Sequence, residues 1–261
     1  MKPQFIDSHA HLAAPEYQND VFEVIERAQQ AGVYHIVTIG AGYGKKSAEE
    51  AIKLADSIDC ISLAVGLHPC DSTEKIEASW LREISQHSKV KALGETGLDF
   101  YWNKTDPEVQ KYNFRVHIDI AKERGLPLVI HSRNAAEDCL KILDETEAKD
   151  AGGVFHCYSE DANFARRLSD INFKVSFPGV ITFKKADAMR AAAKEIPLEQ
   201  IMIETDCPFL APQRVRGKRC EPAYVVDVAL VLAEVKGISL EEVARVTTEN
   251  AQRFFGLSNG L

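Results

Sequence analysis

Short apolar runs rich in β-branched residues recur along the whole chain, and longer stretches with helical periodicity separate them. The eight runs are residues 5–12 (FIDSHAHL), 33–40, 61–69, 90–100, 126–133, 152–159, 172–179 and 201–208. Amphipathic patterns between and after the runs predict helices, among them residues 20–32, 107–125, 222–237 and 239–256. Strands that alternate with helices imply βα units around a parallel sheet.

Eight βα units predict an α/β fold of the (β/α)8 barrel (TIM barrel) type, with one extra helix at the C-terminal end of the chain. Barrels of ~250 residues count as single domains, and the sequence contains no linker or low-complexity tract, so we predict one domain over residues 1–261. An open doubly wound sheet is the alternative, because strand number alone does not close a ring. Polar residues at strand ends along the whole chain favour closure, since only a barrel brings all those ends to one face.

Composition and charge narrow the class of protein. The chain carries 31 Lys and Arg against 39 Asp and Glu, a formal charge of -8, so no global positive charge indicates nucleic acid or an acidic membrane. No apolar run approaches the ~18 residues of a membrane span, and the N-terminal segment lacks the apolar core of a signal peptide. Six cysteines without a C-x-x-C pair favour reduced thiols. We expect a cytoplasmic protein with no membrane contact and no evident obligate protein partner.

The first run raises the question of candidate chemistry, because it places two histidines one residue apart. His9 and His11 share one face if the run is a strand. Asp7 lies on that face as well, and it is a candidate acceptor that orients one of the imidazoles. In the last run the same alternation directs Glu204 and Asp206 into the barrel, while Ile201 and Ile203 face the helices.

Six side chains of metal-ligand type end five of the predicted strands. They are His9, His11, Glu95, His131, His156 and Asp206. A single histidine at a strand end is usually a structural polar group, but six such residues converging on one barrel mouth predict a metal site. A set of imidazoles and carboxylates without thiolates suits Zn²⁺, Mn²⁺, Fe²⁺, Ni²⁺ or Co²⁺, and Mg²⁺ less well.

The blocks DSHAHL, GLHP, GETGLDF, HSR, FHCYS and ETDCP, with a later EP after a basic loop, resemble the TatD-type metal-dependent deoxyribonucleases, which belong to the amidohydrolase-like barrels. The resemblance runs nearly end to end. It implies two divalent ions per chain, with one held by His9, His11 and Asp206, a second held by His131 and His156, and Glu95 bridging both. Cys220 departs from the family pattern, because many relatives read R-N-E-P where this chain reads R-C-E-P.

The resemblance implies a hydrolase that cleaves phosphodiesters, as a 3′-to-5′ exonuclease on single-stranded DNA or RNA. A pair of ions bridged by a carboxylate such as Glu95 can lower the pKa of a shared water, and Asp206 is the candidate that accepts its proton. His68 and Arg133 are candidate substrate contacts. Glu204 is a third candidate, although it could equally orient a ligand or satisfy neighbouring groups in the barrel.

Two other interpretations of the ligand set stay open. The same metals could serve carboxyl chemistry, as in an amidase or an aminoacyl-tRNA deacylase. A non-catalytic metal-binding scaffold is the other, although a scaffold has no need of a complete ligand set around an open pocket.

The loops after the predicted strands add features of the barrel rim. They are locally basic, above all in the run Arg214, Arg216, Lys218 and Arg219, so we expect a positive rim that suits a polyanion. Phe100, Trp102 and Tyr158 also lie near the mouth, where aromatic rings could stack on bases or simply pack.

Overall fold

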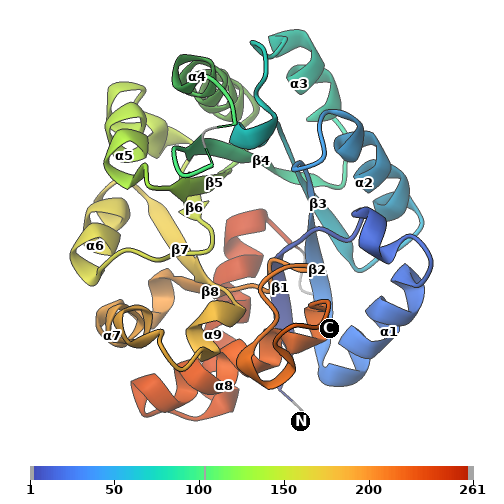
Figure 1. Cartoon of the computed structure of the whole chain (residues 1–261), viewed down its shortest axis with the longest axis vertical. Coiled ribbons are helices and arrows are strands. Elements are labelled where there is room, and N and C mark those ends of the chain that lie inside the picture. Colours follow the sequence, from blue (N-terminus) through green and yellow to red (C-terminus); the bar gives the residue numbers. More distant parts are fainter. Residues whose placement is uncertain (1–2, 103, 258–261) are drawn as a thin grey trace.

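The computed structural model describes residues 3–102 and 104–257, and in this part of the chain strands and helices alternate as predicted (Figure 1). The strands are β1 (Phe5–Ala10), β2 (Val33–Gly40), β3 (Ile61–Val65), β4 (Val90–Asp99), β5 (Leu128–Arg133), β6 (Gly153–Phe155), β7 (Phe173–Phe177) and β8 (Ile201–Ile203). The helices are α1 (Val21–Ala31), α2 (Lys46–Asp56), α3 (Ala78–Ile84), α4 (Pro107–Arg124), α5 (Ala136–Glu145), α6 (Ala162–Asp170), α7 (Asp187–Glu195), α8 (Val225–Lys236) and α9 (Leu240–Phe255). The ends of the predicted domain, residues 1–2 and 258–261, lie outside the described residues. None of the helices described is long and apolar enough to cross a membrane.

The eight strands are parallel and follow one another in the sheet in the order of the chain, from β1 to β8. The sheet returns to its start where Ala10 pairs with Cys207. At this seam the backbone N–H of His11 donates to the carbonyl of Cys207 (2.7 Å), and the N–H of Asp206 donates to the carbonyl of His9 (2.9 Å). The predicted (β/α)8 barrel is therefore confirmed over the open sheet, and its closure lies among the candidate ligands.

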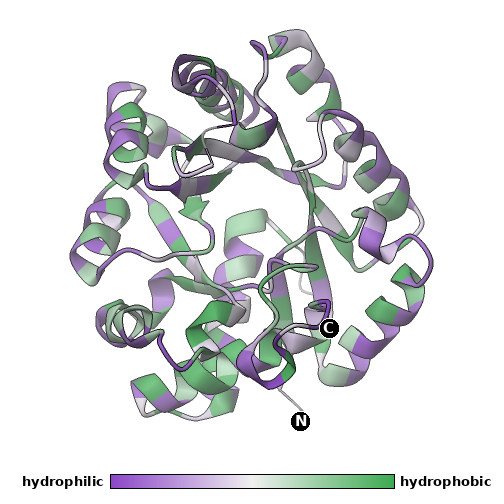
Figure 2. Cartoon of the chain, in the orientation of Figure 1, coloured by the Kyte–Doolittle hydropathy of each residue, from purple (hydrophilic) through white to green (hydrophobic). Residues whose placement is uncertain are grey.

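Apolar side chains fill the barrel and separate it from the helical layer. The interior cluster comprises Ile6, Val37, Ile39, Ala41, Ala64, Ala92, Val129, Val154 and Met202, together with Ala251 and Phe255 of α9. Ile201 and Ile203 belong instead to the cluster between sheet and helices, as the alternation in β8 predicts. The outer helices alternate between hydrophobic and hydrophilic residues (Figure 2), which is the pattern of helices packed on one face.

The extra helix α9 closes the end of the barrel at which the strands begin. Ser239 caps its N-terminus by accepting from the N–H of Glu242, as the sequence predicts. Asn250 donates to the carbonyl of Ile201 at the start of β8 (2.8 Å), and the ring of Phe255 enters the interior cluster. With this end covered, the opposite end, formed by the carboxyl ends of the strands, is the mouth.

Most strands end earlier than the sequence predicts, and β6 and β8, with three residues each, are the shortest. β6 ends at Phe155 and β8 at Ile203, so His156, Glu204 and Asp206 lie in the loops that follow. Cys157 (φ 48°) and Asp206 (φ 56°) adopt left-handed backbone, which ends an extended strand. Left-handed residues other than glycine cost energy and cluster at functional sites. His156 and Asp206 are therefore held in loops that contain left-handed backbone at or next to the candidate ligand.

Candidate metal centre

The carboxyl ends of β1, β4, β5, β6 and β8 bring all six predicted ligand side chains together. Their nitrogen and oxygen atoms form three overlapping groups, within each of which the atoms lie within 4.8 Å of one another. The groups are His9 with His11 and Asp206, His9 with Glu95 and His156, and His68 with Glu95 and His131. The cluster thus also includes His68, for which the sequence predicted a substrate contact.

The first donor set has the spacing of a tetrahedral metal site. The Nε2 atoms of His9 and His11 lie 3.3 Å apart. Asp206 Oδ1 lies 3.7 and 3.4 Å from them, and Glu95 Oε2 lies 3.5 and 3.7 Å from them. Ligand atoms ~2.0–2.2 Å from an ion at the centre of a tetrahedron stand ~3.3–3.6 Å from one another. The atoms of His9, His11 and Asp206 therefore fit a single divalent ion, and Glu95 Oε2 lies beside both imidazoles.

The second donor set forms around the other oxygen of Glu95. Glu95 Oε1 lies 2.8 Å from His131 Nδ1, 2.8 Å from His156 Nε2 and 3.3 Å from His68 Nε2. His131 Nδ1 lies 3.3 and 3.4 Å from the Nε2 atoms of His68 and His156. The nitrogen atom of His68 stands with the other two imidazoles, so it is placed as a ligand as readily as a substrate contact.

Glu95 occupies the centre of the cluster and is almost completely buried. Burial works to raise the pKa of Glu95, but the charges of His156 and His68 outweigh it and hold this pKa well below its usual value. Burial likewise works to lower the pKa of His156, but the carboxylates of Glu95 and Glu204 raise it well above its usual value. The buried carboxylates are thus stabilised by nearby positive charge, which protonated imidazoles or a divalent ion can supply.

Asp7 does not orient an imidazole, contrary to the sequence prediction. Its carboxylate accepts from the N–H of Thr205 (2.9 Å) and of His9 (3.3 Å) and from the Thr205 hydroxyl, which fastens β1 to the loop after β8. Burial raises the pKa of Asp7 to about 8. The pairing of β1 with β2 shifts between Asp7 and Ala10, and this irregularity changes which side chains face inward. Ile6 points into the barrel core, yet His9, three residues later, also reaches the centre of the mouth.

The carboxylate that holds a candidate ligand imidazole, His131, is Asp99, the last residue of β4, which the sequence analysis missed. Its Oδ2 lies 2.9 Å from His131 Nε2, so the proton on Nε2 is directed to Asp99 and Nδ1 is left to face Glu95. Burial works to raise the pKa of Asp99, but the hydrogen bond with His131 contributes to lowering it to about 2. Asp99 lies four residues after Glu95 on one strand, a spacing that places both on one face.

The other predicted substrate contacts lie at different depths. Arg133 ends β5 and is exposed at the mouth. Glu204 is completely buried, and it accepts from the N–H of Cys157 (2.7 Å) and from the hydroxyl of Ser176. It also lies 3.3 Å from His156 Nδ1. Of the roles predicted for Glu204, the structure therefore favours orientation of a ligand and of its loop over contact with substrate.

The predicted aromatic and basic rim is only partly available. Tyr158 is buried and Phe100 packs against the core, whereas Trp102 is 54% exposed. Two of the four basic residues in the run after β8 are already paired, since Arg214 binds both carboxylate oxygens of Asp227, and Arg219 binds Asp20 and Glu221. Arg216 and Lys218 form no ion pair within the described residues, and both are exposed.

Comparison with known proteins places this geometry in a family. The model of the family described as TatD related DNase matches residues 6–256. The chain is 44% identical over 254 residues to the metal-dependent hydrolase YabD of Bacillus subtilis (strain 168), and this alignment covers 97% of this chain and 99% of that protein. It is 37% identical over 259 residues to the metal-dependent hydrolase YcfH of Escherichia coli (strain K12), covering 96% and 95%. The crystal structure of the TatD homologue YJJV from Escherichia coli K12 superposes with a TM-score of 0.92 at 26% identity, over 99% of this chain and 100% of that one.

These matches span the whole barrel and include every strand that carries a candidate ligand. The resemblance found in the sequence blocks is thereby confirmed. The chain belongs to the TatD related DNase family and is a metal-dependent hydrolase of that family.

Proposed function

We propose that this hydrolase is a phosphodiesterase that removes nucleotides from the 3′ end of single-stranded DNA or RNA with two bound divalent ions. The observation that carries the proposal is the position of Glu95, which turns Oε2 to His9 and His11 and Oε1 to His131. Paired sites bridged in this way are typical of enzymes that hydrolyse phosphodiesters. The family description as TatD related DNases supports nucleic acid as the substrate class.

The ligand roles follow from the two donor sets. His9, His11 and Asp206 would hold one ion, and His131 and His156, with His68 beside them, would hold the other. When bound, the ions supply Lewis acidity and make water a nucleophile at neutral pH. The side chains of the protein have to hold this arrangement, bind the phosphate and accept a proton.

Asp206 is the candidate proton acceptor. Its Oδ1 faces His9 and His11, whereas no hydrogen bond from the described part of the chain occupies its Oδ2. Burial works to raise the pKa of Asp206, but the contact with His11 and the charges of the surrounding histidines lower it below its usual value. Asp206 is therefore a carboxylate at neutral pH, and Oδ2 can take the proton that water loses as it attacks phosphorus. Arg133, exposed at the end of β5, suits the non-bridging oxygens of the phosphate.

The test follows the polarity of cleavage. Metal-stripped protein is reloaded with Mn²⁺ or Zn²⁺ and incubated with one single-stranded DNA labelled at the 5′ end or at the 3′ end. We expect the 5′-labelled strand to shorten gradually, and the 3′ label to be released at once as a mononucleotide. We expect Asp206→Asn to lower turnover by about 10²–10⁴-fold, and Asp119→Asn, the same change at an exposed carboxylate of α4, to have no effect. Release of the amino acid from an aminoacylated tRNA, with DNA left intact, would assign the site to carboxyl chemistry instead.

A further inference from the structure

Exposed aromatic rings are concentrated at the mouth of the barrel. Seven large hydrophobic side chains are exposed among the described residues, and four of them lie in loops that follow β2, β4 and β8. These four are Tyr43, Tyr101, Trp102 and Phe209. Large apolar rings exposed together are typical of contact sites, and here they lie in loops at the mouth, where the ring of Phe209 stands 6.1 Å from that of His11.

The loop after β4 forms the most organised part of this ring. The planes of Tyr101 and Trp102 meet at 84° with their centroids 5.1 Å apart. The guanidinium carbon of Arg133 lies 4.0 Å from the centroid of Tyr101 and 5.1 Å from that of Trp102. Lys104 Nζ lies 5.6 Å from the ring of Trp102. We call Tyr101, Trp102 and Arg133 the aromatic platform.

Asp99 ties this platform to the metal centre. Its Oδ1 accepts from the backbone N–H of Tyr101 (3.0 Å) and of Trp102 (2.9 Å), while its Oδ2 accepts from His131. One buried carboxylate therefore sets both the orientation of a candidate ligand and the place of the two rings. The platform is therefore anchored by the same side chain that holds a candidate ligand of the metal centre.

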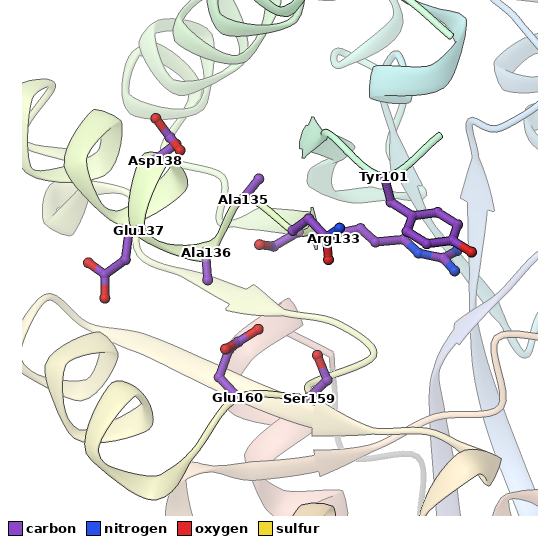
Figure 3. Close-up of a pocket in the computed structure, with 10 residues that line it drawn as sticks. Tyr101, Arg133, Ala135, Ala136, Glu137, Asp138, Ser159 and Glu160 are labelled. Atoms are coloured by element: carbon purple, nitrogen blue, oxygen red, sulfur yellow. The ribbon is translucent and has the colours of Figure 1, made fainter. Parts of the chain in front are cut away.

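The charges around the platform indicate how a chain would lie on it. A pocket of about 580 Å³ begins at Tyr101 and Arg133, and Figure 3 shows the Arg133 side chain extended beneath the ring of Tyr101. The opposite part of the pocket lining carries acidic residues, among them Asp138 and Glu160. Phosphates are thus favoured beside Arg133 and Lys104 and disfavoured along the far side of the pocket.

We propose that the aromatic platform stacks an unpaired nucleobase next to the phosphate held at the metal centre, while Arg133 binds that phosphate or its neighbour. Stacked aromatic rings beside cations are the usual means of holding single strands without reading their sequence. A base in a duplex is paired and is stacked between its neighbours, so its face is not free to stack on the rings. The platform therefore selects single strands. This inference rests on the proposed function and specifies the part of the substrate that the rim recognises.

The chain offers a reporter for this contact that does not depend on hydrolysis. It contains two tryptophans, Trp80 and Trp102. Trp80 lies in α3 and packs against the core, so Trp80→Phe leaves Trp102 as the single reporter. Zn²⁺-loaded protein is titrated with an oligothymidylate whose phosphorothioate linkages slow cleavage, and with an abasic oligomer of the same length and charge.

We expect the oligothymidylate to quench the emission of Trp102 and the abasic oligomer to leave it unchanged. Trp102→Ala should weaken binding of the oligothymidylate roughly tenfold, within the range known for a stacked base, and should hardly affect binding of the abasic oligomer. Phe22→Ala, which removes an exposed ring on the outer face of α1, is the matched control and should change neither.

Equal quenching by both oligomers, or no quenching by either, would overturn the platform. The same holds if Trp102→Ala weakens both oligomers equally. Because these readouts measure contact and not cleavage, they separate the two proposals. A protein that cleaves DNA without base-dependent quenching keeps its proposed function and loses the platform, whereas base-dependent quenching without cleavage keeps the platform and overturns the nuclease.

Discussion

Glu95 presents its two carboxylate oxygens to different sets of nitrogens, with His9 and His11 near one and His68, His131 and His156 near the other. No other side chain of the cluster, within the described residues, reaches both sets with separate atoms. Glu95→Gln replaces one ligand oxygen by an amide that cannot bind a cation and removes the negative charge. We expect protein reconstituted with Zn²⁺ to fall from two ions per chain to at most one, as measured by elemental analysis after dialysis.

The control for this prediction is Glu221→Gln, which removes a buried carboxylate that pairs with Arg27 and Arg219 rather than with the cluster. We expect this variant to keep both ions. Full metal content in Glu95→Gln, or equal loss in both variants, would contradict the bridging role.

Asp99 makes a different prediction, because it holds a ligand without being placed among the donor atoms. Asp99→Asn keeps the side-chain shape but removes the charge that favours the proton on His131 Nε2. Loss of such a supporting carboxylate typically lowers metal affinity by about 10–100-fold. We expect calorimetric titration with Zn²⁺ to show this weakening for one of the two ions only. Weakening of both ions to the same degree would mean that Asp99 acts on the fold as a whole.

The ligand candidates were predictable at this scale because strand ends and side-chain alternation are visible in the sequence. His9 and His11, and likewise His131, were identified in this way, and the structure brings them together. Asp99 was not identified, although its spacing from Glu95 was available, because its role depends on the orientation of the His131 ring. The role of Asp7 was predicted wrongly because the irregularity in β1 leaves no trace in the residue types.

At the scale of elements, the side chain of His117 in α4 supports the loop after β3, which leads to the candidate metal centre. This completely buried imidazole donates from Nδ1 to the carbonyl of Asn113 (2.7 Å) and accepts at Nε2 from the N–H of Leu67 (3.1 Å). The next residue after Leu67 is His68, so a contact inside the helical layer holds part of the second donor set. The helical pattern of residues 107–125 predicted α4 correctly, but nothing in that pattern distinguishes His117 from a solvated polar residue.

Burial lowers the pKa of His117 to about 4, well below the ~6.5 of an exposed imidazole. As the pH falls from about 6.5 to about 4, the unfolded chain binds a proton at this site that the folded protein excludes, so stability falls by up to about 1.4 kcal/mol per pH unit. His117→Gln keeps a side-chain oxygen that can accept from Leu67 but cannot titrate. We expect urea denaturation to show that the stability advantage of the wild type over this variant shrinks by about 2 kcal/mol between neutral pH and about pH 5.

The other ionisable groups are common to the two proteins, so their contributions largely cancel in that difference. A difference in unfolding free energy that stays constant with pH would show that His117 does not stay neutral in the folded protein.

Also at the scale of elements, the ends of the strands were predicted less well than their positions along the chain. Left-handed backbone at Cys157 and Asp206 turns the chain shortly after β6 and β8 end, and a cysteine at position 157 gives no sign of this conformation in the sequence.

At the scale of the whole molecule, a net charge of -8 has to be reconciled with our proposal that the mouth binds a polyanion. The sequence predicted a positive rim from the run between Arg214 and Arg219. The structure divides that run, because Arg214 and Arg219 are paired with carboxylates, while Arg216 and Lys218 are exposed and form no ion pair in the described part of the chain. Ion-pair geometry of this kind depends on residues such as Asp20 and Asp227, whose positions beside the run are fixed only when the barrel closes.

This division allows two double variants that change the net charge equally and differ only in the charges that are free to bind phosphate. We expect Arg216→Ala with Lys218→Ala to weaken binding of a single-stranded oligonucleotide. The slope of log affinity against log salt concentration should become shallower by about 0.7 for each phosphate that the variant no longer neutralises. We expect Arg214→Ala with Arg219→Ala to leave the slope nearly unchanged, because these guanidinium groups are already neutralised by carboxylates. If both pairs flatten the slope to the same extent, the strand senses the overall field of the rim rather than the individual charges of Arg216 and Lys218.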